Sequence, residues 1–319
     1  MKRQIKTNKE YSTVPNLPSG MLEQFQLKFS VVIPAYNSQE YLAETLESVV
    51  NQTFPPYEVV VVDDGSIDQT AEIAASFGSP VEVVTTANRG VGHARNTGID
   101  RVTGDWVFLN DADDIWAPDK LEKFALEIEL NPNAIFGFSD FQTFGNESKK
   151  VRLQKEIQSV DLSQQFLSPV VCILPSAAAF RRTVNARFLE WAQNSGEDCF
   201  FFNDLSDEGE FFHIPELLVN YRKHSHSAQR QTGYRNLTGK NMIKRYMNNP
   251  RDRYRYGNTL IALIKQRRAC RKWADVLDWC KIVETQFPSN LNLRAKTTGI
   301  RWSRWVYRLK DQFDAVGRN

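Results

Sequence analysis

Two aspartates, Asp111 and Asp113, flank an alanine directly after a short apolar run, and this arrangement can bind a metal ion. Hard divalent cations take oxygen ligands and join one or two carboxylates to the phosphates of a substrate. Asp111 and Asp113 are therefore candidate ligands of Mn²⁺ or Mg²⁺. The alternative is that Asp113 or Asp114 caps a helix that begins near Pro118.

A second acidic turn, Asp63-Asp64-Gly65-Ser66, ends another apolar run. Its Asp64 could accept a hydrogen bond from a nucleotide base or a ribose hydroxyl, while Gly65 permits the tight turn. An ordinary Asx turn is the alternative.

The segment 88–98 places glycines before a helix that carries Arg95, which suits a surface facing a diphosphate. These glycines are not a dinucleotide fingerprint, because the first apolar run is followed by Pro34-Ala-Tyr-Asn37 instead of G-x-G-x-x-G. A hydride-transfer enzyme is therefore disfavoured.

Two further motifs lie in the second half of the chain. Glu197 and Asp198 enter a helix beside apolar residues, where a carboxylate can act as a general base or simply cap the helix. The cationic segment 221–227 contains Arg222 and His224. It could cover a diphosphate, His224 could complete a metal shell, or the segment is a solvated loop.

Alternating strands and helices must position these residues. Short runs rich in β-branched residues predict strands that are buried on both faces, and helical spacing of apolar residues predicts helices between them. Strands are expected at 29–33, 59–62, 81–85 and 106–109, and helices at 39–52, 69–77 and 92–101. This order predicts an α/β fold with parallel strands joined by right-handed crossovers. Ligands bind beyond the carboxyl ends of such strands, where the sequence places Asn37, Asp64, Asn88, Asp111 and Asp113.

Later segments predict a change of architecture. Short strands are expected at 134–138, 177–180 and 216–221, with a helix near 197–205. From about residue 234 the pattern becomes helical, with Pro250 and Pro288 between the helices. We therefore expect an N-terminal tail at 1–27, an α/β domain at 28–232 and a C-terminal helical region at 233–319.

Composition excludes several classes of protein. The chain has 319 residues, 41% of them apolar and 24% charged, and a formal net charge of +2, which argues against a dedicated nucleic-acid binder. Its four cysteines form no C-x-x-C pair, which argues against a zinc site and suits a reducing compartment. Residues 1–10 lack the apolar stretch of a signal peptide, and no apolar run reaches the length of a membrane span. A cytoplasmic protein is expected.

The last predicted helix mixes tryptophans and arginines, as in Arg301, Trp302, Arg304, Trp305 and Arg308. A basic amphipathic helix of this kind can lie on an anionic membrane. The alternative is that it packs on neighbouring helices and keeps its charges in water. The first alternative would place the protein at the inner face of the membrane.

Taken together, these motifs resemble the family 2 glycosyltransferases, which have the GT-A fold. The match covers about residues 29–228 and agrees in order and spacing. It comprises Val31-Val-Ile-Pro-Ala-Tyr-Asn37, Gln52-Thr-Phe54, Val62-Asp-Asp-Gly-Ser66, Asn88-x-Gly-x-x-x-Ala-Arg-Asn-x-Gly98, Gly104-Asp-Trp106, Asp111-Ala-Asp-Asp114, Pro118-Asp-Lys-Leu121, Gly196-Glu-Asp198 and Tyr221-Arg-x-His224.

By this resemblance, Pro34, Tyr36 and Asp64 would frame the nucleotide base, with Arg95 nearby. Asp111 and Asp113 would face the ribose and the metal-bound diphosphate, with Asp113 the direct ligand, and Asp198 would be the base. The full set expected to bind the nucleotide sugar is Pro34, Tyr36, Asn37, Asp64, Asn88, Arg95, Asp111, Glu197 and Arg222, and the expected metal ligands are Asp113, Asp111 and His224.

The resemblance implies an inverting transfer of a sugar from a nucleotide diphosphate sugar, expected to be a UDP-sugar, to a hydroxyl of a saccharide or lipid-linked glycan. Departures from the family pattern at 187–195 and 199–203 lie where the acceptor binds, so the identity of the particular acceptor is not implied. A nucleotidyltransferase would carry a glycine-rich basic loop after the first strand, which Pro34-Ala-Tyr-Asn37 is not. A non-catalytic binder is the other alternative, and the presence of four candidate acids speaks against it.

Overall fold

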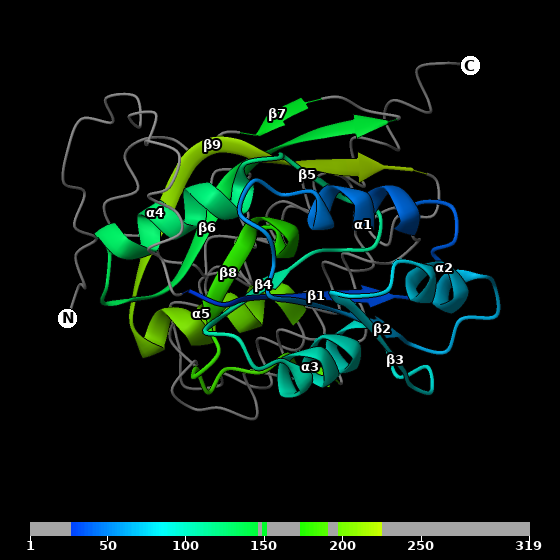
Figure 1. Cartoon of the computed structure of the whole chain (residues 1–319). Helices are drawn as coiled ribbons and strands as arrows, with labels where there is room; N and C mark the ends of the chain where they lie inside the picture. The colour runs from blue at the N-terminus through cyan, green and yellow to red at the C-terminus, as the bar shows by residue number, and fades with distance from the viewer. Residues whose placement is uncertain (1–26, 146–148, 152–172, 191–196, 225–319) are drawn as a thin grey trace, which may run out of the picture. The chain divides into compact units, whose positions relative to one another are not determined.

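The computed structural model describes residues 27–145, 149–151, 173–190 and 197–224. Within these residues the chain forms one sheet in the order β3-β2-β1-β4-β8-β6-β9-β5, with β7 paired to β6 (Figure 1). The strands are β1 Phe29–Ala35, β2 Glu58–Asp63, β3 Val81–Thr85, β4 Trp106–Leu109, β5 Ile115–Trp116, β6 Ala134–Gly145, β7 Lys149–Val151, β8 Ala178–Arg181 and β9 Glu210–Lys223. The helices are α1 Leu42–Val50, α2 Thr70–Ser76, α3 Val91–Arg101, α4 Lys120–Leu130 and α5 Glu197–Glu208, with a 3₁₀ turn η3 at Pro175–Ala177.

The first half of the sheet is parallel, as the alternation of apolar runs predicts. Strand β1 lies between β2 and β4, so that Val31 is paired with Val59 on one side and Phe108 on the other. β1 and β4 are buried throughout, because helices cover both faces of the sheet. The carboxyl ends of β1, β2 and β4 therefore meet at one edge, which confirms the expected α/β fold.

The second half of the sheet adds antiparallel strands to the parallel half. β8 runs antiparallel to both β4 and β6, and β5 runs antiparallel to β9, whereas β6 and β9 are parallel with two irregularities near Asp140. The sheet is therefore mixed. Alternation of strands and helices predicts parallel pairing only where a helix connects two adjacent strands. The element directly before β8 is the short turn η3 and not a crossover helix, so the direction of β8 is not set in this way.

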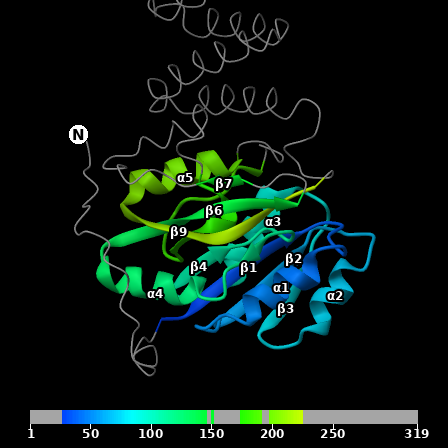
Figure 2. The ribbon, with the colours of Figure 1, turned by 90° about the horizontal axis from the view of Figure 1, so that it is seen from above.

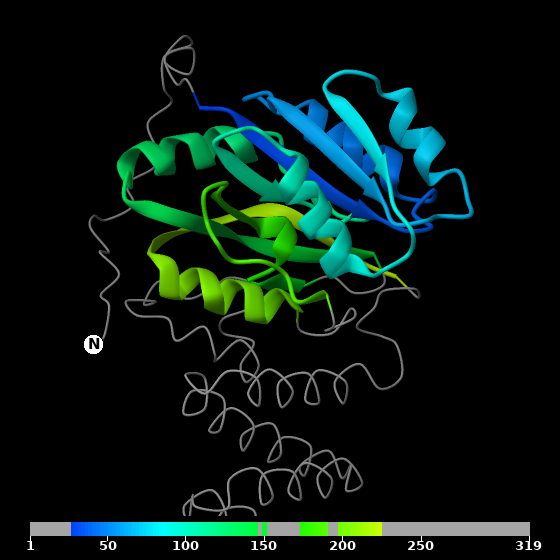
Figure 3. The ribbon, with the colours of Figure 1, turned by 90° about the horizontal axis from the view of Figure 1, so that it is seen from below.

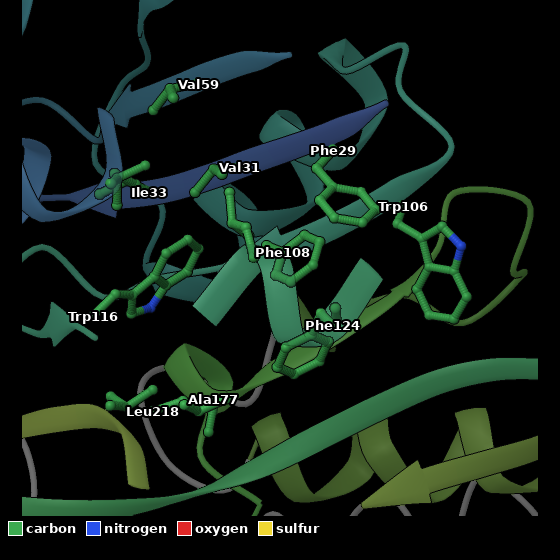
Figure 4. Packing of buried hydrophobic residues seen from close by; sticks show 14 of the residues in the cluster. Phe29, Val31, Ile33, Val59, Trp106, Phe108, Trp116, Phe124, Ala177 and Leu218 are labelled. Atoms are coloured by element: carbon green, nitrogen blue, oxygen red, sulfur yellow. The ribbon is translucent and has the colours of Figure 1, made fainter. Parts of the chain in front are cut away.

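Two apolar cores lie on the two faces of the sheet. Seen from above, α1, α2 and α4 cover one face (Figure 2), and seen from below, α3 and α5 cover the other (Figure 3). Alternate residues of β1 enter opposite cores, Val31 and Ile33 one and Val32 the other. Figure 4 shows Phe108 of β4 at the centre of the first core, between Phe29, Trp116 and Phe124.

Helix α3 packs closely on the sheet through Gly98. This contact predicts that alanine substitutions at two glycines of the helix will affect stability differently. A Cβ atom at Gly98 would lie 2.2 Å from Val32 Cγ1, whereas a Cβ at Gly92 would find its nearest neighbour at 3.4 Å. We expect Gly98→Ala to lower the free energy of unfolding by about 1–3 kcal/mol because the core is overpacked. Gly92→Ala is the control and should not destabilise. Equal denaturant midpoints for the two variants would contradict this packing.

Among the described residues, no helix combines the length and the apolar character that crossing a bilayer requires. The expected N-terminal tail, the domain boundary after residue 232 and the basic amphipathic helix lie outside the described residues.

Candidate functional site

A pocket of about 150 Å³ opens at the carboxyl ends of β1 and β2, beside the start of α3. It brings together four of the residues expected to bind the nucleotide, which come from three separate parts of the sequence. The lining residues are Pro34, Ala35, Tyr36, Asp64, Asn88, Gly90, Val91 and Ala94. Tyr36 is half exposed, so its ring is accessible from solvent at this pocket.

The Asp64 carboxylate organises one wall of the pocket. Its oxygens accept hydrogen bonds from the Thr86 hydroxyl at 2.9 Å, from the Arg89 amide at 3.1 Å and from the Gly90 amide at 2.7 Å. The Asx turn considered as an alternative is made by its neighbour, because Asp63 Oδ1 accepts from the Ser66 amide at 3.0 Å. Asp64 therefore shapes the loop before α3, and its side chain is almost fully buried.

Asn37 links the first two strand ends and does not line the pocket. Its backbone is in the left-handed region with φ of 49°, a conformation that asparagine tolerates better than most residues. The Asn37 side-chain oxygen accepts from the Ile67 amide at 3.0 Å, and the Asn37 amide donates to Ser66 Oγ at 2.9 Å. Gly65, with φ of 78°, turns the intervening loop toward Asn88.

The acidic turn at 111–114 is held by a buried serine that the sequence does not single out. Ser176 Oγ accepts from the Asp111 amide at 3.0 Å and donates to Asp114 Oδ2 at 2.5 Å. Asp114 Oδ1 accepts from the Arg222 amide at 3.0 Å. Burial raises the pKa of Asp114 well above its usual value, and the charges of Asp113 and Asp111 raise it further. Asp114 thus anchors the turn, and no side-chain cap is made to α4.

Lys120 supports the same turn from beneath. Its side chain is fully buried, its Nζ donates to the Ser176 carbonyl at 2.6 Å, and it lies 3.7 Å from the centre of the Trp116 ring. Burial lowers the pKa of Lys120 well below its usual value, although the charge of Asp114 opposes this effect. Trp116 Nε1 donates to the same carbonyl at 3.0 Å, so Ser176 joins β4, β5 and α4.

Asp113 and His224, two of the three expected metal ligands, are in direct contact. His224 Nε2 lies 2.7 Å from Asp113 Oδ2. Burial raises the pKa of Asp113, the charge of Asp111 raises it further, and His224 lowers it. The structure places the third expected ligand, Asp111, against Arg95 at 2.7 Å. Within the described residues, no three His, Cys, Asp or Glu side chains are grouped to hold a metal ion.

This donor set fits a hard divalent cation that also binds a substrate. Mg²⁺ and related ions are commonly held by one or two carboxylates together with substrate phosphates, so a complete protein cage is not required. Asp113 supplies a carboxylate and His224 supplies an imidazole at the same edge of the sheet as the pocket. A cation there would also favour the ionised form of Asp113, which burial disfavours.

Arg222, expected to contact the nucleotide sugar, is committed to protein groups. Its Nε donates to the Asp113 carbonyl at 2.9 Å, and its Nη2 bonds Glu44 Oε2 at 2.5 Å. The guanidinium lies between the rings of Tyr41 and Phe144, 4.6 Å and 4.5 Å from their centres. Arg222 therefore fixes the acidic turn from β9.

The last group links the acidic turn to α5. Arg95 Nη2 bonds Asp111 Oδ1 at 2.7 Å, and Arg95 Nη1 bonds Glu197 Oε1 at 2.9 Å. Burial alone would lower the pKa of Arg95, but the charges of Asp111 and Glu197 raise it above its usual value. Asp198, the expected base, follows Glu197 in the first turn of α5 and is partly exposed.

The raised pKa of Glu197 predicts that the stability of the protein depends on pH. Burial and the charge of Asp198 raise its pKa from 4.5 to about 7, although Arg95 opposes the shift. Between these two values the unfolded chain ionises Glu197 while the folded chain keeps it protonated, so rising pH favours unfolding. Relative to the parent chain, Glu197→Gln should gain about 1–3 kcal/mol of stability as pH rises from 4.5 to 7. Urea titrations at several pH values measure this gain, and a constant difference would contradict it.

The fold and this site define a class, an α/β protein with a pocket and an acidic turn at the carboxyl ends of its parallel strands. The model of the family described as glycosyl transferase family 2 matches residues 30–189, which is half of the chain. The chain belongs to glycosyltransferase family 2.

Individual relatives agree with this family. An uncharacterised glycosyltransferase of Rickettsia bellii is 30% identical over 218 residues, which are 66% of this chain and 31% of the relative. The putative teichuronic acid biosynthesis glycosyltransferase TuaG of Bacillus subtilis is 34% identical over 122 residues, which are 37% of this chain and 48% of TuaG. The match thus spans about a third to a half of these relatives' lengths.

Solved structures share the fold. S. aureus TarS in complex with UDP-GlcNAc has a TM-score of 0.59 at 20% identity, covering 89% of this chain and 92% of that one. The mannosyltransferase PcManGT from Pyrobaculum calidifontis, in complex with GDP-Man and Mn²⁺, has a TM-score of 0.51 at 19% identity, covering 93% and 82%. The mixed sheet flanked by helices is therefore the GT-A fold.

Proposed function

We propose that this chain is a metal-dependent inverting glycosyltransferase that moves a sugar from a UDP-sugar to a hydroxyl of a saccharide or lipid-linked glycan. The observation that carries the proposal is the linkage of three groups at one edge of the sheet. The pocket ends at Ala94, the next residue Arg95 bonds Asp111, and the same guanidinium bonds Glu197 beside Asp198. The protein groups proposed to bind the nucleotide, to bind the diphosphate and to activate the acceptor would then line one cleft.

The proposed roles follow from the chemistry of each group. Pro34, Tyr36 and Asn88 would contact the nucleotide base and ribose in the pocket whose wall Asp64 holds. Asp113 and His224 would hold Mn²⁺ or Mg²⁺, which supplies positive charge to neutralise the leaving diphosphate. Asp198 would take the proton from the acceptor hydroxyl as that oxygen attacks the anomeric carbon and the bond to the diphosphate breaks. A single displacement of this kind inverts the anomeric centre.

The named relatives support the choice of ligands. TarS was crystallised with UDP-GlcNAc and PcManGT with GDP-Man and Mn²⁺, so the shared fold holds sugar nucleotides in both. TuaG is described as a putative glycosyltransferase of teichuronic acid biosynthesis. We infer a UDP-sugar from the greater similarity to TarS, and a polysaccharide or its lipid-linked precursor as acceptor from TuaG.

A thermal-shift screen tests the proposal. A ligand that binds the native state raises the melting temperature, and the increase grows with the ligand's concentration and affinity. We expect UDP-sugars with Mn²⁺ to raise the melting temperature more than GDP-sugars, and each to act less without the metal. If no nucleotide sugar changes the melting temperature in either condition, the proposal is wrong. Binding without release of UDP would instead indicate a non-catalytic binder.

A further inference from the structure

Arg95 occupies an unusual position between two acidic groups. Its guanidinium bonds Asp111 of the acidic turn with one terminal nitrogen and Glu197 of α5 with the other, at 2.7 Å and 2.9 Å. Arg95 is 3% exposed, and the guanidinium lies 5.0 Å from the centre of the Phe188 ring. Both terminal nitrogens are thus directed at protein carboxylates and the side chain is closed off from solvent.

The burial of Arg95 separates it from the residues that line the pocket. Val91 and Ala94, on the same helix, line the pocket, whereas Arg95 is directed at Asp111, which follows β4, and at Glu197 of α5. Its buried Nε has no hydrogen-bond partner among the described residues, so the guanidinium bonds through Nη1 and Nη2 and not through Nε. A phosphate group could reach Arg95 only by displacing Asp111 or Glu197.

Charge explains why a guanidinium suits this place. Asp111, Glu197 and Asp198 are acidic groups from two segments about 86 residues apart, and in their ionised forms they repel one another. All three stabilise the positive charge of Arg95. The planar fork of arginine can bond two carboxylates in fixed directions, which the single ammonium of lysine cannot reproduce.

We propose that Arg95 is a positioning residue that holds the acidic turn of the donor site and the first turn of α5 in one fixed arrangement, and is not a ligand of the nucleotide diphosphate. This inference rests on the proposed function, because its consequence is the placement of Asp198 relative to the bound donor. It assigns Arg95 a different role from the contact with the donor that the sequence motif implies.

Two substitutions separate the geometry of Arg95 from its charge. Arg95→Lys keeps the positive charge and loses the fork, so kcat should fall about 100-fold through misplacement of the base. The acid limb of its pH–rate profile should stay where it is in the parent chain. Arg95→Met loses both properties, so its acid limb should also move to higher pH by about one unit or more, because the positive charge of Arg95, which interacts with Asp198 and favours its ionised form, is lost. Among the described charged groups, Arg95 and Glu197 interact electrostatically with Asp198.

The assay is release of UDP from UDP-GlcNAc in the presence of Mn²⁺, with water as the attacking nucleophile. Arg101→Lys and Arg101→Met are the matched controls, because Arg101 lies on the same helix and bonds an exposed glutamate, Glu82, at 2.6 Å. Both controls should keep the parent kcat and acid limb. If Arg95→Met does not fold, the lysine variant alone tests the inference, with its melting temperature measured alongside.

The outcomes distinguish this inference from the proposed function. A parent chain that binds no UDP with Mn²⁺ in calorimetry and releases none overturns the proposed function. A parent chain that is active, with an Arg95→Lys variant of equal kcat, overturns the positioning role alone. Weaker binding of UDP to Arg95→Lys, with kcat unchanged, would also overturn it, because a direct ligand behaves in that way.

Discussion

We expect Asp198→Asn to lower the rate of sugar transfer by about 10²–10⁴-fold, the usual contribution of a general base. Asparagine has nearly the shape of aspartate but cannot accept the proton of the attacking hydroxyl. Asp198 lies in the first turn of α5 beside Glu197 and is not among the residues that line the pocket. The affinity for UDP should therefore stay the same while kcat falls. Calorimetry with UDP and Mn²⁺, together with a UDP-release assay, measures both quantities.

The matched control is Asp207→Asn, the same change on an exposed residue near the other end of α5. This variant should retain the parent kcat. Substantial turnover by Asp198→Asn would mean that another group accepts the proton. A loss of UDP affinity in that variant would mean that Asp198 helps to bind the donor.

Asp113→Ala should remove the effect of metal on donor binding. Asp113 contributes the carboxylate of the pair with His224, and its backbone carbonyl accepts a hydrogen bond from Arg222 that alanine retains. The turn should therefore keep its shape while the oxygen ligand is lost. In calorimetry, the affinity for UDP measured with Mn²⁺ should fall to the value measured without it.

Asp100→Ala, which removes an exposed carboxylate on α3, serves as the control and should bind UDP as the parent chain does. Undiminished Mn²⁺-dependent binding by Asp113→Ala would show that the cation is held by other groups. His224→Gln would then be the next variant, because it removes the imidazole from the same pair.

The parallel half of the fold could be predicted from the sequence because each of its elements carries its own pattern. Val59 to Val62 and Trp106 to Leu109 are apolar throughout and form strands with helices between them, as expected. In the antiparallel half, the sequence predicts strands at 134–138, 177–180 and 216–221, but no local signal sets the order and direction in which they pair. The pairing of β8 between β4 and β6 depends on the packing of residues such as Phe136 and Phe180, which are register partners on the neighbouring strands β6 and β8.

The site shows the same division. The meeting of parallel strand ends predicts that Asp64 and Asn88 lie close together, and the family resemblance adds Pro34 and Tyr36. The structure brings these four residues to one pocket. No sequence pattern points to Ser176, a small residue whose importance comes only from its partners in space. The commitments of Arg222 and Arg95 to protein carboxylates were likewise hidden, because an arginine in a motif suits a phosphate and a carboxylate equally well.

The way in which the acidic turn is held has a consequence for biosynthesis of the chain. Asp111 to Asp114 leave the ribosome early, yet the partners that fix them are Ser176, Arg222 and His224, up to 111 positions later. A nascent polypeptide can therefore complete β1 to β4 before it can assemble the groups proposed to grip the cation. Metal-dependent binding of a sugar nucleotide would then arise only after β9 has been translated, so partially synthesised molecules would hold the donor less tightly than the finished chain does.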